Sequence, residues 1–384
     1  MIEKIHFCRA VFICRITSIK KHFHHSGGSY YPGKLATLYC PDFLERAAKN
    51  VNTVLVVGTN GKTTVSRFIS HMLEGIGIHN FSNRSGANMY NGIATAYGLN
   101  CTFLGRKKKK TAIIECDELY VNQVIEILKP SVIVVTNIAD DQSYRLGNAA
   151  NTVKIFLKDF KNAHQTAFCL NKDNTYAAEL GNEIGQNCYY YSVCGNTILV
   201  AGKRFVIPDN IREDYNIENT AAACLCIDLL GYSLEKAIET LKTVKLPFGR
   251  MERFCVERTN VLLVLAKNAV STNAVIRALK QNDDNQVLIF AINNNVTDDV
   301  DLSWLDDVDF TTLEGLFSKI YVSGNCGRAL CDKFNGVCQI LNESTLEFVK
   351  SVNSSVTIIA NYTAMMEIRE DFASHGYIKN FWKD

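Results

Sequence analysis

A glycine-rich segment carries the clearest chemistry in this sequence. Residues 58–64 read GTNGKTT and stand between an apolar, β-branched run at 53–57 and an amphipathic stretch at 62–74. Between a strand and a helix, such a turn offers backbone N–H groups, a helix N-terminus and a lysine to a polyphosphate. The sequence therefore predicts a nucleotide site, with the binding residues Gly58, Thr59, Asn60, Gly61, Lys62, Thr63 and Thr64.

The residue types within this segment predict separate roles. Gly58 and Gly61 allow a tight turn and a close approach of the phosphates. Lys62 would reach the β- and γ-phosphates and act in catalysis, and Thr63 would ligate Mg²⁺. The segment is two residues shorter than the common G-x-x-x-x-G-K-[ST] pattern, and the alternative is a turn that only caps the next helix.

Acidic residues follow the second apolar run. Glu115, Asp117 and Glu118 lie in the segment IIECDEL. Alternate residues at a strand end point to the same face, so Glu115 and Asp117 share one face. A carboxylate beside the threonine of a phosphate loop commonly holds a metal, so we predict Glu115 as a catalytic residue and, with Thr63, as a Mg²⁺ ligand. The alternative is a set of surface acids.

Polar residues also follow the third apolar run. Asn137, Asp141 and Gln142 lie in TNIADDQ. They could bind a second metal or position ATP or a substrate, or they could form an ordinary polar loop. In parallel sheets, ligands bind where the strands end, and these residues fall there together with the glycine-rich segment and the acids.

Alternation of strands and helices defines the fold class. The predicted strands lie at 53–57, 111–118, 131–141 and 166–174. The predicted helices lie at 62–74, 121–129, 151–160, 216–231 and 233–244, the last with Ser233 as N-cap. A small β section is expected at 188–208, and beyond residues 247–254 the alternation restarts. We therefore predict two α/β units with parallel sheets.

The composition excludes several classes of protein. The 384 residues are 47% hydrophobic and 21% charged, with a net charge of +2, which gives no global reason to bind nucleic acid. Fourteen scattered cysteines without a C-x-x-C pair favour buried thiols in a reducing cytoplasm. There is no signal-peptide pattern and no long apolar run that would span a membrane.

Two basic segments have alternative interpretations. The N-terminal residues 1–25 are basic and amphipathic, so they could touch an anionic membrane surface at its cytoplasmic side, or form a helix that packs on the next domain. The run RKKKK at 106–110 is typical of a solvated hairpin tip.

Taken in order, several motifs resemble those of the Mur ligases, and within them of the MurT ligase subunits. In chain order, the motifs are GGSYYPGKLATLYCPDFL, GTNGKTT, NRSGANMYNGIATA, ECDE, TNIADDQ, DYNIENTAAA, GRMERF, LAKN, DDVDLSWLDDVDF, VSGNCGRA and ANYTAMMEIR. The resemblance implies an N-terminal segment (1–45), a central ATP-binding domain with a parallel sheet (46–247) and a Rossmann-like C-terminal domain (248–384) that binds a partner.

The resemblance also implies an activity. A MurT-type ligase uses ATP and Mg²⁺ to phosphorylate the α-carboxylate of D-glutamate in the stem peptide of lipid II, in peptidoglycan synthesis. Ammonia from a separate glutaminase, a GatD-like subunit, then attacks the acyl phosphate and leaves D-isoglutamine. No glutaminase nucleophile motif is found here, which agrees with a separate partner.

Further site residues follow from the resemblance alone. Arg250 would add a guanidinium for the transferring phosphate, and Asn216 and Asn219 would lie by the adenine or ribose of ATP. Asp298 and Asp301 match an acidic segment from which an aspartate completes the partner's catalytic Cys-His pair. An ordinary solvated acidic loop is the alternative for these two.

The chain also departs from the MurT pattern. The four-cysteine zinc ribbon is missing, although Cys169, Cys188 and Cys194 remain in that region, so we predict no zinc. Asp140, Tyr144 and Asp299 replace an arginine, an aspartate and a glycine of the pattern. Substrate and partner surfaces are thus altered, which leaves two alternatives: a ligase that joins an amino acid, as folylpolyglutamate synthases do, and a nucleotide-binding scaffold without catalysis.

Overall fold

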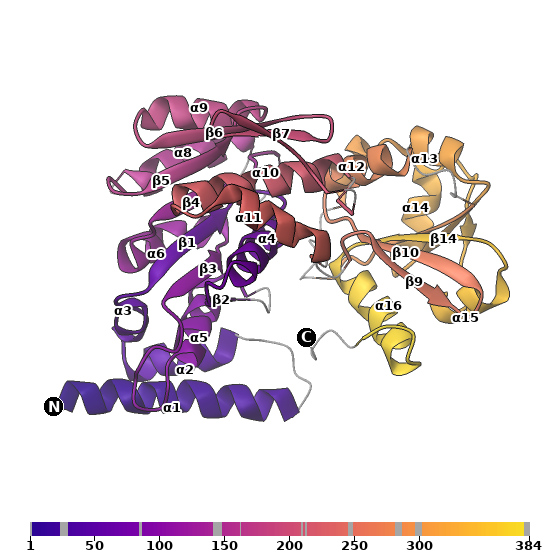
Figure 1. Cartoon of the computed structure of the whole chain (residues 1–384). Coiled ribbons are helices and arrows are strands. Elements are labelled where there is room, and N and C mark those ends of the chain that lie inside the picture. Colours follow the sequence, from indigo (N-terminus) through magenta and orange to yellow (C-terminus); the bar gives the residue numbers. More distant parts are fainter. Residues whose placement is uncertain are drawn as a thin grey trace. The chain divides into compact units, whose positions relative to one another are not determined.

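The computed structural model describes residues 2–23, 30–83, 87–140, 148–161, 163–208, 210–211, 213–244, 249–280, 286–295 and 302–379. They fall into two compact units, Met1–Val244 and Lys245–Asp384 (Figure 1). The three-part division at residues 45 and 247 stays a prediction.

An eight-stranded sheet forms the centre of the first unit, in the order β2-β3-β1-β4-β5-β6-β7-β8. Its strands are β1 (Asn52–Val57), β2 (Asn80–Ser82), β3 (Thr111–Glu115), β4 (Val132–Val135), β5 (Ala167–Asn171), β6 (Cys188–Cys194), β7 (Thr197–Val200) and β8 (Lys203–Val206). All pairings are parallel as far as β6, and β7 and β8 add an antiparallel edge. The central strands are short, β-branched and buried on both faces, as parallel strands are when helices cover both sides.

Helices pack on both faces of this sheet (Figure 1). They are α1 (Ile2–Phe23), α2 (Tyr30–Tyr39), α3 (Phe43–Ala48), α4 (Lys62–Gly75), α5 (Tyr90–Asn100), α6 (Val121–Leu128), α8 (Ala149–Phe160), α9 (Thr175–Ile184), α10 (Asp214–Leu229) and α11 (Leu234–Thr240), with short 3₁₀ turns η1 (Glu118–Tyr120) and η2 (Leu241–Thr243). One core joins Leu55 and Val57 of β1 to α5, α6 and α8. On the other face α10 packs against α4 and β5. Helix α1 packs against α2 and α5, and its buried side chains belong to the same core as Leu55 and Val57.

The second unit has a six-stranded sheet in the order β13-β12-β11-β14-β10-β9, parallel except for β9. Its strands are β9 (Glu252–Val256), β10 (Thr259–Leu265), β11 (Val287–Ala291), β12 (Lys319–Ser323), β13 (Gln339–Ile340) and β14 (Val356–Ala360). Its helices are α12 (Ala269–Leu279), η3 (Ser303–Asp307), α13 (Phe310–Leu316), α14 (Gly327–Lys333), α15 (Thr345–Ser351) and α16 (Tyr362–Ser374). The predicted fold class, two α/β units with mostly parallel sheets, is confirmed.

Local signals set several element boundaries. The strand predicted at 111–118 ends at Glu115, because Asp117 accepts a hydrogen bond from the backbone N–H of Leu119 (3.2 Å) and caps η1. The strand predicted at 131–141 ends already at Val135. Ser233 caps α11, as predicted, by accepting from the backbone N–H of Lys236 (3.4 Å).

The basic run at 106–110 is solvated only in part. Lys107 donates to the carbonyl of Arg46 (2.7 Å) and Lys108 to that of Leu99 (2.8 Å). Lys109 donates to the carbonyl of Asn80. The prediction of a solvated tip is therefore wrong for Lys107 and Lys109, which are half-buried and held by carbonyl groups. Arg106, Lys108 and Lys110 are exposed, as predicted.

The cysteines agree with the prediction of mainly buried thiols. All fourteen are free, and the buried ones are Cys14, Cys40, Cys101, Cys116, Cys169, Cys224, Cys226 and Cys326. Burial raises the pKa of the Cys169 and Cys224 thiols, so they pack as small apolar side chains. Within the described part of the chain, no helix is long and apolar enough to cross a membrane.

Candidate nucleotide-binding site

The glycine-rich turn joins β1 to α4, as predicted, and two of its glycines adopt positive φ. Gly58 has φ +119° and Gly61 has φ +86°. A Cβ on Gly58 would lie 2.5 Å from Thr136 Oγ1, and one on Gly61 would overlap Asn219 Oδ1. Only glycine fits both the backbone conformation and the space, so the two residues are fixed by the shape of the turn.

The residues that follow β4 hold the turn through hydrogen bonds. The backbone N–H of Asn60 donates to Asn137 Oδ1 (3.0 Å), and the carbonyl of Asn60 accepts from Thr136 Oγ1 (2.6 Å). Thr59 Oγ1 accepts from the backbone N–H of Ala139 (3.1 Å). Asn137 therefore braces the loop, and the metal, ATP or substrate contact that the sequence suggested stays a prediction. Asp141 and Gln142 lie outside the described residues.

Lys62 is buried and makes an ion pair with Glu118. Its Nζ lies 2.8 Å from Glu118 Oε1 and donates to the carbonyl groups of Gly58 and Thr59. Burial alone would lower the pKa of the Lys62 ammonium, but the charge and hydrogen bond of Glu118, together with the charges of Glu115 and Asp117, outweigh burial and raise that pKa above its ordinary value. The ammonium is thus held charged inside the turn, where a polyphosphate would need it.

Thr63 and Glu115 converge at the same place. Thr63 Oγ1 donates to Glu115 Oε2 at 2.9 Å. Asn83, just after β2, fixes the backbone of Glu115, because its Oδ1 accepts from the N–H of Glu115 (2.9 Å) and its Nδ2 donates to the carbonyl (2.8 Å). Glu115, Asp117 and Glu118 are all buried, so these are not the surface acids of the alternative interpretation.

Helix α10 brings two asparagines toward the turn. Asn219 lies against Gly61, at the N-terminus of α4. Asn216 is fully buried; its Nδ2 donates to Glu213 Oε2 (3.0 Å), while its Oδ1 has no hydrogen-bond partner among the described residues. Asn219 thus lies beside the phosphate-binding turn, and a contact of either side chain with adenine or ribose stays a prediction.

Comparison with known proteins accounts for both units. The family model described as Mur ligase middle domain matches residues 56–227, and the model described as MurT ligase C-terminal matches residues 265–365. The chain belongs to the Mur ligase family and carries a MurT-type C-terminal domain. It is accordingly a Mur-ligase-type, ATP-dependent carbon–nitrogen ligase.

Relatives and solved structures agree with this assignment. The MurT subunit of lipid II isoglutaminyl synthase (glutamine-hydrolyzing) from Streptococcus pneumoniae is 29% identical over 92% of this chain and 94% of its own length. The corresponding subunit from Staphylococcus aureus is 28% identical over 74% and 77%. MurF from Acinetobacter baumannii shares the fold, with a TM-score of 0.68 at 14% identity over 88% of this chain and 80% of its own. Folylpolyglutamate synthase from Mycobacterium tuberculosis also shares the fold, with a TM-score of 0.69 at 14% identity over 86% of this chain and 92% of its own.

The side chains at this Mur ligase turn fit a nucleotide with Mg²⁺. The turn offers two positive-φ glycines, a buried ammonium and a helix N-terminus to phosphates, while Thr63 and Glu115 offer two oxygens to a hard cation. Among the described residues, no group of three or more His, Cys, Asp or Glu could hold a metal by itself. Mg²⁺ usually takes one or two protein oxygens and completes its shell with phosphate and water, so two oxygens suffice.

The remaining predicted residues belong to the second unit. Arg250 lies just before β9, in a segment held by a hydrogen bond from the backbone N–H of Leu265 to the carbonyl of Gly249 (2.7 Å). Its contact with a phosphate stays a prediction. Asp298 and Asp301 lie outside the described residues, so their role stays a prediction as well, and so does the absence of zinc.

An amide network marks the strand ends of this MurT-type unit. Asn361, after β14, accepts from the backbone N–H of Asn293 (3.1 Å) and donates to its carbonyl (2.6 Å). Asn293, after β11, accepts from the N–H of Asn325 (2.9 Å) and donates to Glu367 (3.1 Å). These amides tie the ends of three neighbouring strands together, and no sequence pattern used above predicted them.

Proposed function

We propose that the chain is the ligase subunit of a lipid II isoglutaminyl synthase. In this proposal it uses ATP to amidate the α-carboxylate of D-glutamate in the lipid II stem peptide. The observation that carries the proposal is the pairing of a complete phosphate-binding turn, with Lys62 buried and charged, with a C-terminal domain of MurT type. The MurT subunits of two bacteria are similar over most of their length, which supports it.

The residues of the turn fit the first half-reaction. A carboxylate resists attack by ammonia until one oxygen becomes part of a good leaving group, which phosphorylation provides. Phosphoryl transfer depends mainly on positioning and on neutralising charge. Backbone N–H groups at the start of α4 would orient the phosphates, and Lys62 would neutralise charge on them. Mg²⁺, held by Thr63 and Glu115, would supply further neutralisation when bound. Arg250 is proposed to add a guanidinium.

The second half-reaction needs ammonia. The name of the pneumococcal enzyme describes it as glutamine-hydrolysing. We therefore propose a GatD-like glutaminase as partner of the C-terminal domain, with Asp298 or Asp301 completing its catalytic pair. Ammonia would attack the acyl phosphate carbon, the C–O bond to phosphate would break, and inorganic phosphate would leave with ADP formed earlier.

A reconstitution tests the proposal. Purified chain, a candidate glutaminase, ATP, glutamine and lipid II are incubated, and the stem peptide is analysed by mass spectrometry for replacement of a carboxyl OH by NH₂. We expect amidation that requires both proteins, that is lost in Lys62→Ala and that is kept in Lys161→Ala, an exposed lysine after α8.

Two results would contradict the proposal. Amino acid incorporation without glutaminase would favour a ligase of the folylpolyglutamate synthase type. Nucleotide binding without any substrate-dependent turnover would favour a scaffold.

A further inference from the structure

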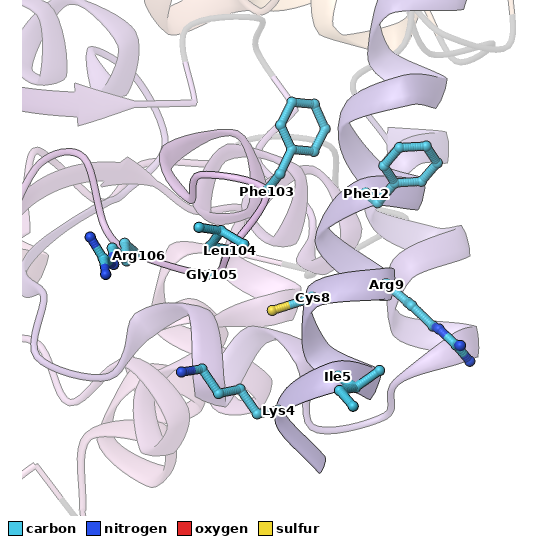
Figure 2. Close-up of a pocket in the computed structure, with 9 residues that line it drawn as sticks. All are labelled: Lys4, Ile5, Cys8, Arg9, Phe12, Phe103, Leu104, Gly105 and Arg106. Atoms are coloured by element: carbon cyan, nitrogen blue, oxygen red, sulfur yellow. The ribbon is translucent and has the colours of Figure 1, made fainter. Parts of the chain in front are cut away.

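An open groove of about 740 Å³ lies between helix α1 and the turn at 103–106, far along the chain from the nucleotide turn. Its walls include Ile5, Arg9, Phe12, Phe103, Leu104 and Arg106. Figure 2 shows the rings of Phe12 and Phe103 near one end of the groove and Lys4 near the other. The groove is mainly apolar, with cations around it.

Helix α1 carries two apolar faces. Phe7, Val11 and Cys14 are buried and pack toward α2 and α5. The exposed side chains of Ile5, Phe12 and Ile19 follow at intervals of seven residues, which is close to two helical turns, so they share the outward face. Phe12 is 53% exposed. Packing among the described residues of this unit accounts for the burial of the first face only.

The turn at 103–106 extends the outward face. Leu104 is 69% exposed, and the ring centroid of Phe103 lies 5.8 Å from that of Phe12. Arg15 lies over the Phe103 ring (4.8 Å) and donates to the carbonyl groups of Leu99 (3.0 Å) and Cys101 (2.8 Å). These contacts of Arg15 hold the turn in place beside α1. Large exposed apolar patches usually mark an interaction surface.

The charges around the groove have one sign. Lys4, Arg9 and Arg106 line it, and the lining includes no acidic residue. The nearest acid in the sequence of α1, Glu3, is paired with Arg46 (3.3 Å). Apolar side chains bordered by lysine and arginine match the chemistry of an anionic lipid surface, where the rings enter the boundary between headgroups and chains and the cations meet phosphates.

We propose that this groove face, α1 with the turn at 103–106, docks the enzyme on an anionic membrane. A second copy of the chain fits less well, because it would bring the same cations against one another. The link to a lipid-borne substrate rests on the proposed function, whereas the docking itself rests on the groove alone.

Vesicle binding tests the docking without substrate, nucleotide or glutaminase. Full-length chain is sedimented with vesicles of phosphatidylglycerol and phosphatidylcholine, and with vesicles of phosphatidylcholine only. We expect binding to the first and little to the second. The double variant Phe12→Ser/Leu104→Ser should lower the association constant on the order of tenfold or more. Arg9→Gln/Arg106→Gln should lower it by about tenfold and reduce its salt dependence.

Matched controls change residues that do not line the groove. Val206→Ser changes another exposed apolar residue (65%), and Lys319→Gln another exposed cation; both should bind like wild type. Circular dichroism confirms that every variant is folded. Equal binding by wild type and groove variants, or no binding by folded wild type, would overturn the docking proposal. A change of oligomeric state in the groove variants without a change in vesicle binding would assign the face to a second copy, and loss of glutaminase binding alone would assign it to the partner.

Because no lipid II is present, failure here leaves the amidation reaction untouched. Conversely, vesicle binding by a chain that fails to amidate lipid II would keep the docking and remove the proposed function.

Discussion

The strand ends of the two sheets carry different kinds of side chains. In the first unit, Lys62, Glu115 and Glu118 bring full charges into buried positions around the phosphate-binding turn. In the second unit, Asn293 and Asn361 use neutral amides to join backbone groups of neighbouring strands. Both are parallel α/β sheets, so the architecture alone does not decide what the edge can do.

The difference separates a ligand-dependent edge from a self-contained one. Buried charges are costly unless a partner of opposite charge compensates them, so binding of a polyphosphate should change the stability of the first edge. Amides in mutual hydrogen bonds satisfy one another and need no ligand. The charged edge should therefore respond to nucleotide and pH, and the amide edge mainly to changes that unpair its backbone groups.

The largest effect is expected at Lys62. Lys62→Met removes the buried ammonium but keeps an unbranched side chain, so nucleotide-dependent turnover should fall at least about 10²–10³-fold, the cost of losing one strong transition-state donor. Turnover is measured as ADP release. Asn293→Ala in the amide edge serves as the comparison and should lose far less. Similar losses for the two variants would break the distinction between the edges.

Glu118→Gln should separate the roles of the buried pair. Without its carboxylate partner, Lys62 becomes an uncompensated buried charge, and the nucleotide-free protein should lose about 3 kcal/mol of stability. Bound ATP should then raise the free energy of unfolding of Glu118→Gln by more than it raises that of wild type. Urea unfolding with and without ATP measures both quantities. An equal ATP effect in both proteins would show that Glu118 and phosphate do not compete for Lys62.

Asn361→Leu should unpair the amide edge. The backbone N–H and carbonyl of Asn293 would lose their partners inside the protein, at about 2–3 kcal/mol in total. The free energy of unfolding measures this, and ATP affinity should change less than in Lys62→Met. Asn295→Ala is the control: it removes two exposed hydrogen bonds, one to Thr363 (3.0 Å) and a long one from Asn325 (3.5 Å), and should stay within about 0.5 kcal/mol of wild type.

Glycine substitutions compare the two edges at the backbone. Gly58→Ala and Gly324→Ala should each cost about 1–3 kcal/mol, since both residues have positive φ and an added Cβ would overlap Thr136 in one case and the carbonyl of Ile292 in the other. Gly77→Ala, at φ +87° with open space around it, should cost only the backbone strain, about 1 kcal/mol. Only Gly58→Ala should also weaken ATP binding in a calorimetric titration.

The smallest effect concerns alkaline pH. The pKa of Lys62 is raised above its ordinary value of 10.5 in the folded chain. Its contribution to stability is therefore fully present below about pH 10 and is lost as pH rises through the folded pKa. Wild type should lose more stability than Lys62→Met as pH rises above 10.5 in urea unfolding. Identical slopes for the two proteins would contradict the raised pKa.

Local signals made the nucleotide turn predictable. The GTNGKTT segment between an apolar run and an amphipathic stretch sets β1, the turn and α4, and alternation along β3 places Glu115 beside Thr63. These features depend on residues close together in the sequence, or on the rule that parallel strands end at one edge of a sheet.

Long-range contacts were not predictable. Glu118 reaches Lys62 only because the chain leaves the strand geometry at Glu115 and enters a 3₁₀ turn, where strand alternation no longer applies. Asn83 meets Glu115 across 32 residues, and Asn361 meets Asn293 across 68. Such pairs follow from the three-dimensional packing, because the motifs that contain Asn83 and Asn361 do not indicate which distant residue each side chain meets.

The lysines after the turn at 103–106 have an electrostatic consequence for the first unit. The carbonyl of Leu99, in the last turn of α5, accepts from both Lys108 and Arg15, and the carbonyl of Arg46, in the last turn of α3, accepts from Lys107. Cations at these positions compensate the partial negative charge at the C-terminal ends of two helices, which stabilises both helices. The basic run thus neutralises partial charges inside its own unit, and its formal charge overstates what it offers to solvent.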